Sequence, residues 1–456
     1  MFLEIVHAEG LSHLSYIFGD GGKAAVIDPR RDCKIYADIA NSRGARITHI
    51  FETHCHEDFV SGALELARRT GAEIYHGHAL AFRYGTGVRE GETFDLGNLS
   101  LKVIETPGHT PESICLTLSD RVYSERPVAV FTGDTLFIGD AGRTDLFPAM
   151  RDELVEKLYD SLHRKIMPLG DHVIIYPAHG EGSVCAKKPA SREFSTLGFE
   201  RQSNPMLARS RKDFIQHNLW EEHHAPPYFW QMQKFNREGI PLVAKLPEPK
   251  PENAENFAAA IDQHGLLVLD VRSPEAFAGA HIPDSLSIPL DRFSLMAGWF
   301  LPYDRTIGLV AERAEDAAKA RLFLMRMGFD NASMYLAGGM TAWTGAGKSF
   351  ASIPTVDAEE LRRRIAIRED LLVLDVRSRT EYAEIPSDPS QNTWIGDLPR
   401  QLNALPRDKK IVAFCSNGQR AIIAASLLQQ ANFRRVEVYL GSDKAYKALQ
   451  ISKKAA

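Results

Sequence analysis

One octapeptide, Leu-Leu-Val-Leu-Asp-Val-Arg-Ser, occurs twice in the chain, at Leu266–Ser273 and again at Leu371–Ser378, 105 residues further on. This separation indicates two copies of one domain, because solenoid repeats have periods of about 20–50 residues. In each copy a buried strand is followed by a second apolar strand, an Ala-rich helix and a short strand. Strands that alternate with helices predict a parallel sheet covered on both faces.

The segment Lys245–Asn253 separates the two copies from the first half of the chain. Its three prolines among charged residues cannot support a helix or a central strand, so the segment is interpreted as an extended linker. We therefore expect three domains, which cover residues 1–245, 254–352 and 355–456. In the first domain, short apolar strands alternate with helices, and the polar motifs follow strand ends, where open α/β sheets place their sites.

The composition is that of a globular chain without a nucleic-acid or membrane partner. Lys and Arg number 54 and Asp and Glu 59, which gives a net charge of −5. This balance argues against general nucleic-acid binding, which needs a basic surface, although it leaves room for a local basic pocket. No apolar run approaches the about 18 residues of a membrane span and no signal peptide is visible, so we expect a cytoplasmic protein. The scattered cysteines form no C-x-x-C pair, which excludes a zinc ribbon and fits a reducing compartment. They are Cys33, Cys55, Cys115, Cys185 and Cys415.

Four polar clusters in the first domain each follow an apolar, strand-like run and present a His or an Asp on a turn. Imidazole and carboxylate groups on loops at one edge of a sheet can converge on a cation. Four such clusters in one domain therefore predict a metal site. The clusters are Thr53–Phe59, Thr106–Thr110, Thr132–Thr135 and Tyr176–Gly180.

The first cluster, together with the later His, Asp and His, resembles the H-x-H-x-D-H signature of the metallo-β-lactamase superfamily. The resemblance covers roughly residues 1–240 and implies an αββα sandwich. There is one departure from the signature, because Phe59 stands where the family usually has His. In the two-zinc hydrolases of this fold that His helps to hold the second metal, and Phe cannot ligate. We therefore expect a site for a single metal.

The persulfide dioxygenases of this superfamily are similar to this domain and hold one Fe(II) with two His and one Asp. The resemblance implies one Fe(II) per chain on His54, His109 and Asp134, with zinc as an alternative or adventitious occupant. Such a set leaves open positions for O₂ chemistry. The remaining polar residues of the signature would then orient the ligands or bound water. These residues are His56, Asp58 and His179.

Two further segments resemble the persulfide dioxygenases: Gly142–Asp145 and the stretch from Ser195 to Pro205. They imply that a glutathione-like persulfide is held by Arg143, Tyr176 and Arg201, since Arg binds carboxylates through two parallel hydrogen bonds. Structural roles for these arginines remain an equal alternative. Cys185, six residues after His179, is a candidate for sulfur relay at the catalytic site, with a structural thiol as the alternative.

In the second copy an apolar strand runs directly into Cys415, and a helix begins a few residues later. Backbone N–H groups, the helix N-terminus and Arg420 favour a thiolate there, and a thiolate can accept and pass on a sulfane sulfur. The C-x-x-G-x-R segment resembles the active loop of rhodaneses, and an inert buried Cys is the alternative. Between Cys415 and Arg420 the loop holds Ser416, Asn417, Gly418 and Gln419.

The first copy has Ala311 opposite Cys415 and Asp316 opposite Arg420. An acidic loop without sulfur cannot stabilise a thiolate, so this copy is interpreted as a rhodanese-like domain without catalysis. The fold class expected for the whole chain is α/β multidomain. It consists of a metallo-β-lactamase αββα sandwich followed by two rhodanese-like α/β domains with parallel sheets.

The function implied by these resemblances is oxidation of glutathione persulfide, or a similar low-molecular-weight persulfide, by O₂ to sulfite, coupled to sulfane-sulfur transfer through Cys415. The expected partners are the persulfide and its thiol, O₂, thiosulfate and sulfite, and we expect a homo-oligomer. Two alternatives remain open. One is a zinc-dependent thioester hydrolase of the glyoxalase II type fused to rhodanese modules. The other is a sulfur-carrier protein with a vestigial metal site.

Overall fold

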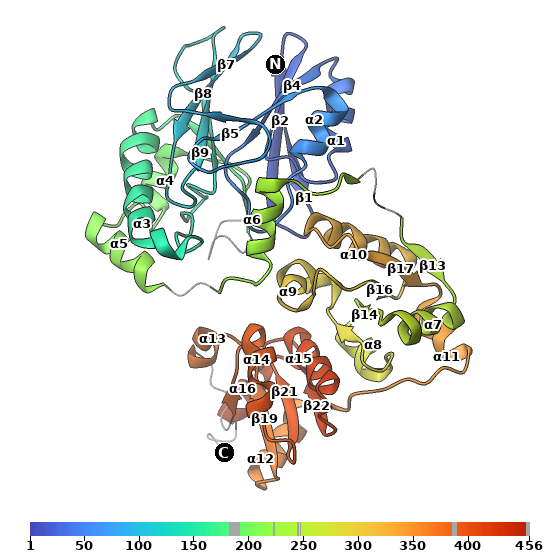
Figure 1. Cartoon of the computed structure of the whole chain (residues 1–456). Helices are drawn as coiled ribbons and strands as arrows, with labels where there is room; N and C mark the ends of the chain where they lie inside the picture. The colour runs from blue at the N-terminus through green and yellow to red at the C-terminus, as the bar shows by residue number, and fades with distance from the viewer. Residues whose placement is uncertain (182–191, 222–223, 244–245, 247, 385–389, 453–456) are drawn as a thin grey trace. The chain divides into compact units, whose positions relative to one another are not determined.

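The computed structural model of the chain describes residues 1–181, 192–221, 224–243, 246, 248–384 and 390–452. It divides into two compact units (Figure 1). The first contains Met1–Leu246 with Met325–Gly328, and the second contains Pro247–Leu324 with Phe329–Ala456. No helix in the described part of the chain has both the length and the apolar character needed to span a bilayer.

Two mixed sheets form the centre of the first unit. In the order of pairing, the first consists of β1 (Phe2–Ala8), β2 (His13–Asp20), β3 (Lys23–Ile27), β4 (Arg46–Glu52), β5 (Glu73–Gly77) and β6 (Thr86–Val88). The second consists of β12 (Ser195–Thr196), β11 (Ile174–Pro177), β10 (Ala129–Gly133), β9 (Ile114–Asp120), β8 (Leu99–Glu105) and β7 (Thr93–Leu96). Apolar side chains from the facing strands of both sheets, such as Phe18, Phe51 and Phe131, make the core between them.

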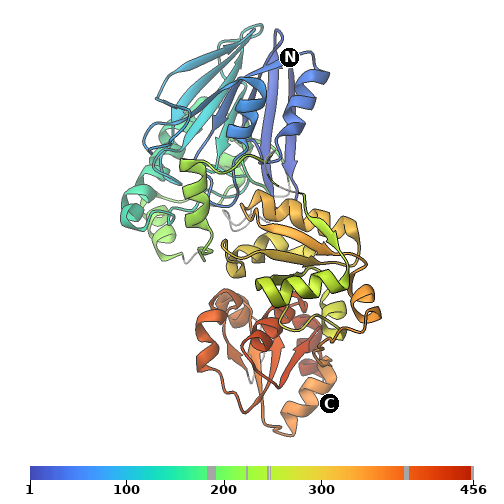
Figure 2. The same ribbon diagram turned by 45° about the vertical axis from the view of Figure 1, so that its right-hand side comes forward.

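Helices cover the outer faces of both sheets (Figures 1 and 2). The first sheet packs against α1 (Lys34–Ser42) and α2 (Ala63–Thr70), whose buried residues share a cluster with β3 and β4. The second packs against α3 (Arg151–Asp160), α4 (Leu197–Ser203) and α5 (Arg211–Trp220). The α6 helix (Phe229–Glu238) follows. The four layers confirm the expected αββα sandwich.

The second unit contains two parallel sheets of the same topology, one from each copy of the repeat. The first has the order β13 (Lys250–Glu252), β17 (Ala332–Leu336), β16 (Ile307–Val310), β14 (Leu267–Asp270) and β15 (Leu286–Ser287). The second has the order β18 (Thr355–Val356), β22 (Val436–Tyr439), β21 (Lys410–Phe414), β19 (Leu371–Asp375) and β20 (Gln391–Asn392). Every neighbouring pair runs parallel, as the alternation of strands and helices predicted.

The helices of this unit alternate with its strands. The first copy contains α7 (Ala254–His264), α8 (Pro274–Gly279), α9 (Phe293–Phe300), α10 (Ala314–Arg326) and α11 (Gly339–Gly345). The second contains α12 (Ala358–Ala366), α13 (Arg379–Glu384), α14 (Leu398–Gln401), α15 (Gln419–Gln430) and α16 (Asp443–Ser452). The predicted linker contributes β13, an edge strand that tolerates Pro251 because one side of an edge needs no donor. The exact domain boundaries stay a prediction.

The repeated octapeptide has the same structure in both copies. The Asp that ends β14 accepts hydrogen bonds from the guanidinium two residues later, with 2.7 Å between Arg272 Nη2 and Asp270 Oδ2. In the second copy 2.6 Å separates Arg377 Nη2 from Asp375 Oδ2. Both carboxylates are buried, so these ion pairs hold the loop after each strand in place.

Candidate metal centre and sulfur-transfer loop

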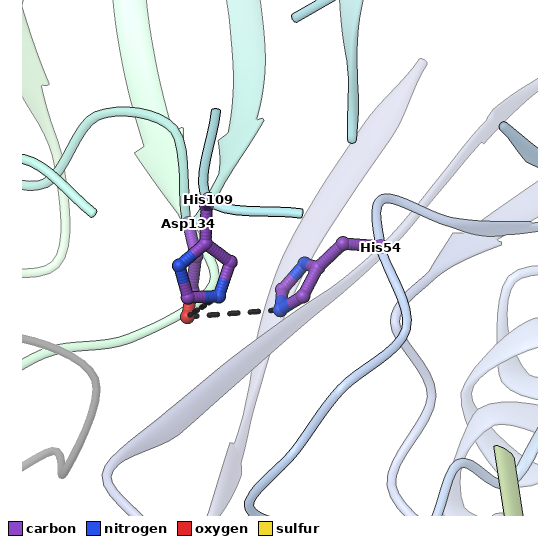
Figure 3. A group of neighbouring side chains, drawn as sticks. All are labelled: His54, His109 and Asp134. Carbon is purple, nitrogen blue, oxygen red and sulfur yellow. Dashed lines mark ion pairs between the residues drawn. The ribbon is translucent and has the colours of Figure 1, made fainter. Parts of the chain in front are cut away.

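His54, His109 and Asp134 lie just after the ends of β4, β8 and β10, and their side chains converge (Figure 3). One ligand atom from each lies within 4.8 Å of the others. His54 Nε2 is 3.7 Å and His109 Nε2 is 3.5 Å from Asp134 Oδ2. All three side chains are buried. The first unit therefore brings together the three ligands that the resemblance implied.

Hydrogen bonds on the far side of each imidazole direct Nε2 toward this point. Thr53 donates its hydroxyl proton to Asp28 Oδ2 at 2.8 Å, so its oxygen accepts from His54 Nδ1 at 2.9 Å. The carbonyl oxygen of Arg143, which can only accept, lies 2.9 Å from His109 Nδ1. These contacts fix the Nδ1–H form of both rings, as is usual for metal-binding histidines.

The atoms that meet at the centre have no hydrogen-bond partners among the described residues. These atoms are the two Nε2 nitrogens of His54 and His109 and Oδ2 of Asp134. Leaving a buried polar atom unpaired is costly, and a bound cation removes that cost. The site therefore fits a metal ion held by two imidazoles and one carboxylate.

The pKa values of His54 and His109 are shifted in opposite directions. Burial lowers the pKa of His54 well below its usual value, so this ring stays neutral. Burial also opposes protonation of His109, but the negative charge of Glu57 outweighs it and raises the pKa of His109 to about 9. A metal ion at the centre competes with a proton for His109.

The other signature residues form a second layer around the ligands. His179 Nδ1 lies 2.7 Å from Oδ1 of Asp134, and its Nε2 lies 2.9 Å from Asp58 Oδ2. Burial opposes protonation of His179, but these two carboxylates raise its pKa well above the usual value. His56 Nε2 lies 3.1 Å from Oδ1 of Asp28, the residue that also supports Thr53. These contacts agree with an orienting role, which stays a proposal.

Phe59, at the position where the signature has His, is completely buried. Its ring centroid lies 4.0 Å from that of His13 and 4.4 Å from that of His56. The space where the family would bring in a second metal ligand therefore holds an apolar ring. His13 itself is buried, and neither of its ring nitrogens has a hydrogen-bond partner in the part of the chain that is described.

Sequence reasoning missed three residues of this centre. His13, at the start of β2, belongs to no motif, and nothing in the sequence links it to the other histidines. Asp28 follows β3 directly, as the recognised site residues follow their strands, and that placement was a usable signal. Its φ of +50° is unusual for a residue other than Gly. Glu57 lay inside the first cluster but was treated as a spacer.

Two glycines allow the chain to approach the centre closely. Gly133, next to Asp134, has a φ of +51°, and a Cβ there would lie 2.6 Å from Thr53 Oγ1. A Cβ on Gly142 would lie 2.0 Å from the carbonyl oxygen of Asp134. Side chains at either position would push Asp134 away from the two histidines.

Of the three residues predicted to hold substrate, Arg143 contacts the metal centre through its backbone carbonyl, which accepts from His109 Nδ1, while the guanidinium groups of Arg143 and Arg201 are engaged elsewhere. Arg143 is buried and donates to both carboxylate oxygens of Asp145, each at 2.7 Å. Arg201 donates to Asp171 at 3.0 Å and to a backbone carbonyl. Tyr176 is partly buried, with its ring 5.3 Å from that of Tyr16. Cys185 lies outside the described residues.

Cys415 directly follows β21, and its side chain is completely buried. The backbone N–H of Ala421, in the first turn of α15, donates to Cys415 Sγ at 3.3 Å, and Sγ lies 3.9 Å from Asn417 Oδ1. Gly418 has a φ of +82° and forms the N-cap of α15. The loop thus presents the thiol to the N-terminus of a helix, as the rhodanese resemblance implied, and the thiol has to become accessible before it can react with a donor.

Arg420 has a strong partner that the sequence did not reveal. Its Nη1 and Nη2 donate to the two carboxylate oxygens of Glu381, each at 2.7 Å, and Nη2 also donates to Ser416 Oγ at 3.0 Å. Burial opposes ionisation of Glu381, but the hydrogen bonds and charge of Arg420 outweigh it and lower the pKa of Glu381 to about 2. Arg420 is therefore held beside the loop.

The first copy of the repeat packs against α15, the helix that begins at the Cys415 loop. His281 Nε2 lies 2.9 Å from Gln429 Oε1, and Ser426 Oγ accepts from the backbone N–H of Ser287 at 3.2 Å. Apolar residues of the first copy share one buried cluster with residues of α15. Ala311 follows β16 as Cys415 follows β21, so the alanine occupies the equivalent position.

Comparisons with known proteins agree with this architecture. Residues 8–179 match the metallo-beta-lactamase superfamily, and residues 253–346 and 357–449 each match the rhodanese-like domain. A solved metallo-beta-lactamase from Staphylococcus aureus is 33% identical, with a TM-score of 0.66 over 74% of this chain and 99% of that one. The chain belongs to the metallo-beta-lactamase superfamily. Two rhodanese-like domains follow its lactamase-like domain, which confirms the predicted fusion.

Two curated relatives of this superfamily member differ in their reactions. Human persulfide dioxygenase ETHE1, mitochondrial, is 29% identical over 209 residues, which are 44% of this chain and 74% of that protein. Hydroxyacylglutathione hydrolase GloC of Haemophilus influenzae is 30% identical over 230 residues, which are 45% of this chain and 98% of that protein. Similarity alone therefore does not choose between oxidation and hydrolysis.

Proposed function

We propose that this chain oxidises a low-molecular-weight persulfide, glutathione persulfide or a close analogue, by the reaction RSSH + O₂ + H₂O → RSH + H₂SO₃. The observation that carries the proposal is the metal centre itself. Two imidazole nitrogens and one carboxylate oxygen face one point there without hydrogen-bond partners among the described residues, while an apolar ring at position 59 occupies the place of a further ligand. The similarity to persulfide dioxygenase ETHE1 supports the same reaction.

The metal would be held by His54, His109 and Asp134. An Fe(II) ion bound by two His and one carboxylate keeps open positions for O₂ and substrate, and supplies the redox chemistry. Residues around the site hold the ligand side chains in the orientation that metal binding needs. Thr53 and the carbonyl of Arg143 orient the two imidazoles, and His179 orients Asp134 through the oxygen that does not face the centre.

A zinc-dependent hydrolase of the glyoxalase II type is the second candidate, favoured by the similarity to GloC. Such an enzyme uses two metals to activate a bridging water. In this chain Phe59 cannot ligate, and His56 is engaged with Asp28. The donors for a second metal are therefore fewer than in the full signature, which makes this candidate the weaker one.

For the substrate we propose that Arg143, Tyr176 and Arg201 contact the carboxylates and peptide groups of a glutathione-like thiol. Arg143 has to release existing partners in order to do so, because its Nε and Nη2 donate to Asp145 and its Nη1 donates to the carbonyl oxygen of His224. Cys185 remains a proposed sulfur relay.

Sulfane-sulfur transfer is proposed for the second rhodanese-like domain, with Cys415 as the nucleophile and the segment Ser416–Arg420 as its loop. The thiolate would attack a sulfane sulfur of thiosulfate or a persulfide, form a Cys415 persulfide and release sulfite or a thiol.

We also propose that the protein is cytoplasmic and forms a homo-oligomer. Scattered cysteines support the location because they fit a reducing compartment.

The test is O₂ uptake and sulfite formation by the full chain, loaded anaerobically with Fe(II) and given glutathione persulfide. The same preparation loaded with zinc is tested for hydrolysis of a glutathione thioester. We expect about one iron per chain and stoichiometric sulfite, with no sulfite from His54→Ala. Thioester hydrolysis by protein that holds two zinc ions would support the hydrolase instead. Sulfur loading without any metal-dependent activity would support the sulfur carrier with a vestigial metal site.

A further inference from the structure

His13, the first residue of β2, is a buried imidazole without a hydrogen bond. It is 1% exposed, and neither Nδ1 nor Nε2 has a partner among the described residues. Burial lowers the pKa of His13 well below its usual value, so the ring is neutral and offers one N–H donor and one lone-pair acceptor. Unpaired polar atoms in a protein interior are costly and uncommon. The fold therefore keeps an unfavourable side chain at this position.

The backbone holds His13 in place. His13 forms a bridge with His179, and beside this bridge the N–H of Gly180 donates to the carbonyl oxygen of Ser12 at 2.9 Å. Ser12 has a φ of +54°, in the left-handed region that residues other than Gly adopt infrequently. Such strain persists where the surrounding structure enforces it, and it gathers at functional sites. The strained residue directly before His13 thus points to a function for the imidazole.

The ring of His13 lies beside two residues that each adjoin a metal ligand. Its centroid is 5.4 Å from that of His179 and 5.8 Å from that of His56. His179 Nδ1 in turn lies 2.7 Å from Asp134 Oδ1. The ring of His56 lies 4.1 Å, between centroids, from that of His54. The unpaired nitrogens of His13 therefore belong to the layer of side chains that surrounds the metal ligands.

A second metal ion does not account for His13. Within the described ranges of the chain, one group of three side chains brings its ligand atoms close enough to share an ion, and His13 is not in that group. The ring of Phe59, 4.0 Å away between centroids, offers His13 no polar contact. What fits an unpaired N–H beside a metal centre is an atom of the substrate that accepts a hydrogen bond.

We infer that His13 binds the substrate by donating a hydrogen bond from its ring N–H to the terminal sulfur of a persulfide anion at the metal centre. The inference rests on the proposed function, which brings an anionic sulfur to this place. A hydrogen bond to an ionised acceptor is about twice as strong as one between neutral groups. The bound anion therefore offsets the cost of the unpaired N–H, and His13 helps to orient the sulfur toward the metal.

The experiment measures anaerobic binding of hydrosulfide, the smallest anionic sulfur ligand, to the full chain loaded with cobalt(II), whose visible spectrum reports sulfur ligation. His13→Phe keeps a ring of similar size and removes both nitrogens. Hydrosulfide affinity should fall by about tenfold to a hundredfold, the usual effect of losing a hydrogen bond to a charged group. His13→Gln retains an N–H donor and should restore part of the affinity. Unchanged affinity in His13→Phe would overturn the inference.

Stability without hydrosulfide gives a second readout, which a structural role would move in the opposite direction. His13→Phe replaces unpaired polar atoms by apolar ones, so it should raise the urea midpoint of the lactamase-like domain. His76→Phe serves for comparison, because His76 is also buried and each of its ring nitrogens lies 3.0 Å from a backbone carbonyl oxygen. That variant should lower the midpoint and leave hydrosulfide affinity unchanged. A lower midpoint with unchanged affinity in His13→Phe would assign His13 a structural role.

Hydrosulfide binding needs neither O₂ nor turnover, so it tests His13 separately from the reaction. An iron-loaded wild type that forms no sulfite from glutathione persulfide would contradict the proposed function. Weaker hydrosulfide binding by His13→Phe would in that case still support His13 as a sulfur-binding residue. Normal sulfite formation by the wild type, together with unchanged hydrosulfide affinity in His13→Phe, would do the reverse.

Discussion

Arg292, in the rhodanese-like copy that lacks a cysteine, donates a hydrogen bond from Nε to Oε1 of Gln419, the first residue of α15. Asn417 Nδ2 donates to the same oxygen at 3.4 Å, and Asn417 Oδ1 accepts from the backbone N–H of Gln419 at 3.3 Å. Asn417 in turn contacts the thiol, with 3.9 Å between its Oδ1 and Cys415 Sγ. The copy without a nucleophile thus supports the loop of the copy that has one.

Replacing Arg292 by Ala should slow sulfur loading of Cys415. A hydrogen bond from a charged group contributes about 1.5–3 kcal/mol, so loss of this contact should reduce the loading rate by about tenfold or more. The measurement is the rate at which the protein gains the mass of one sulfur from thiosulfate. Arg313→Ala is the control, because Arg313 is an exposed side chain of the same copy that donates to Asp316. Equal rates in the two variants would refute a supporting role.

Cys415→Ser should abolish thiosulfate:cyanide sulfurtransferase activity of the full chain, because Ala311 leaves the first copy without a nucleophile. The same variant should keep sulfite formation from free glutathione persulfide, since the metal ligands lie in the other unit. Both activities are measured on one preparation. Residual sulfurtransferase activity would mean that another thiol, such as Cys185, acts as a nucleophile.

Thr53→Val should lower metal affinity by about 10–100-fold, because it removes the oxygen that accepts from His54 Nδ1 and so loosens the orientation of the imidazole. The chain offers a matched control in β4, the strand that leads to Thr53. Thr48 Oγ1 lies 2.8 Å from Nδ1 of His49, which is not at the metal centre, so Thr48→Val should leave affinity unchanged. Affinity is measured by competition with a chromophoric chelator. If both variants bind metal alike, the hydrogen bond to His54 has no orienting role.

Phe59→Ala should destabilise the lactamase-like domain by about 3–5 kcal/mol, the usual cost of emptying a completely buried aromatic site. The expected result is a lower urea midpoint for the unfolding transition of that domain. Phe199→Ala provides the comparison, because Phe199 is 46% exposed and its loss leaves no buried cavity. A midpoint shift no larger than that of Phe199→Ala would show that the ring does not fill the space between the histidines.

The Glu381–Arg420 ion pair should make the stability of the second rhodanese-like domain depend on pH in acid. The folded-state pKa of Glu381, about 2, lies below the ordinary Glu value of about 4.3, so folding favours its charged form. The pair therefore contributes fully above about pH 5, and its contribution is lost as the pH falls toward 2. In Glu381→Gln the free energy of unfolding, measured by urea titration, should fall less steeply between about pH 5 and pH 2 than in the wild type. The same pH dependence in variant and wild type would show that the Glu381–Arg420 pair does not contribute to stability.

The sequence, with the family resemblance that it carries, was sufficient for the architecture and for the three residues that converge at the candidate metal centre. The octapeptide repeat predicted two parallel α/β domains, since identical strands and loops impose identical local structure. His54, His109 and Asp134 were found because each lies in a polar cluster that follows an apolar strand, and the topology brings such strand ends to one edge. The family resemblance then selected these three from the larger set of polar residues.

Only the tertiary structure showed which partners these residues have. Glu57 lies beside His109, Glu381 binds Arg420, and Arg292 contacts the Cys415 loop through Gln419. No spacing in the sequence indicates any of these contacts. Gln419 lies 127 positions from Arg292 in the chain. Local periodicity and turn chemistry act over a few residues, so they determine strands, helices and the residues at their ends. Contacts between distant side chains depend on how whole layers and domains pack, and this packing decides which carboxylate meets which cation.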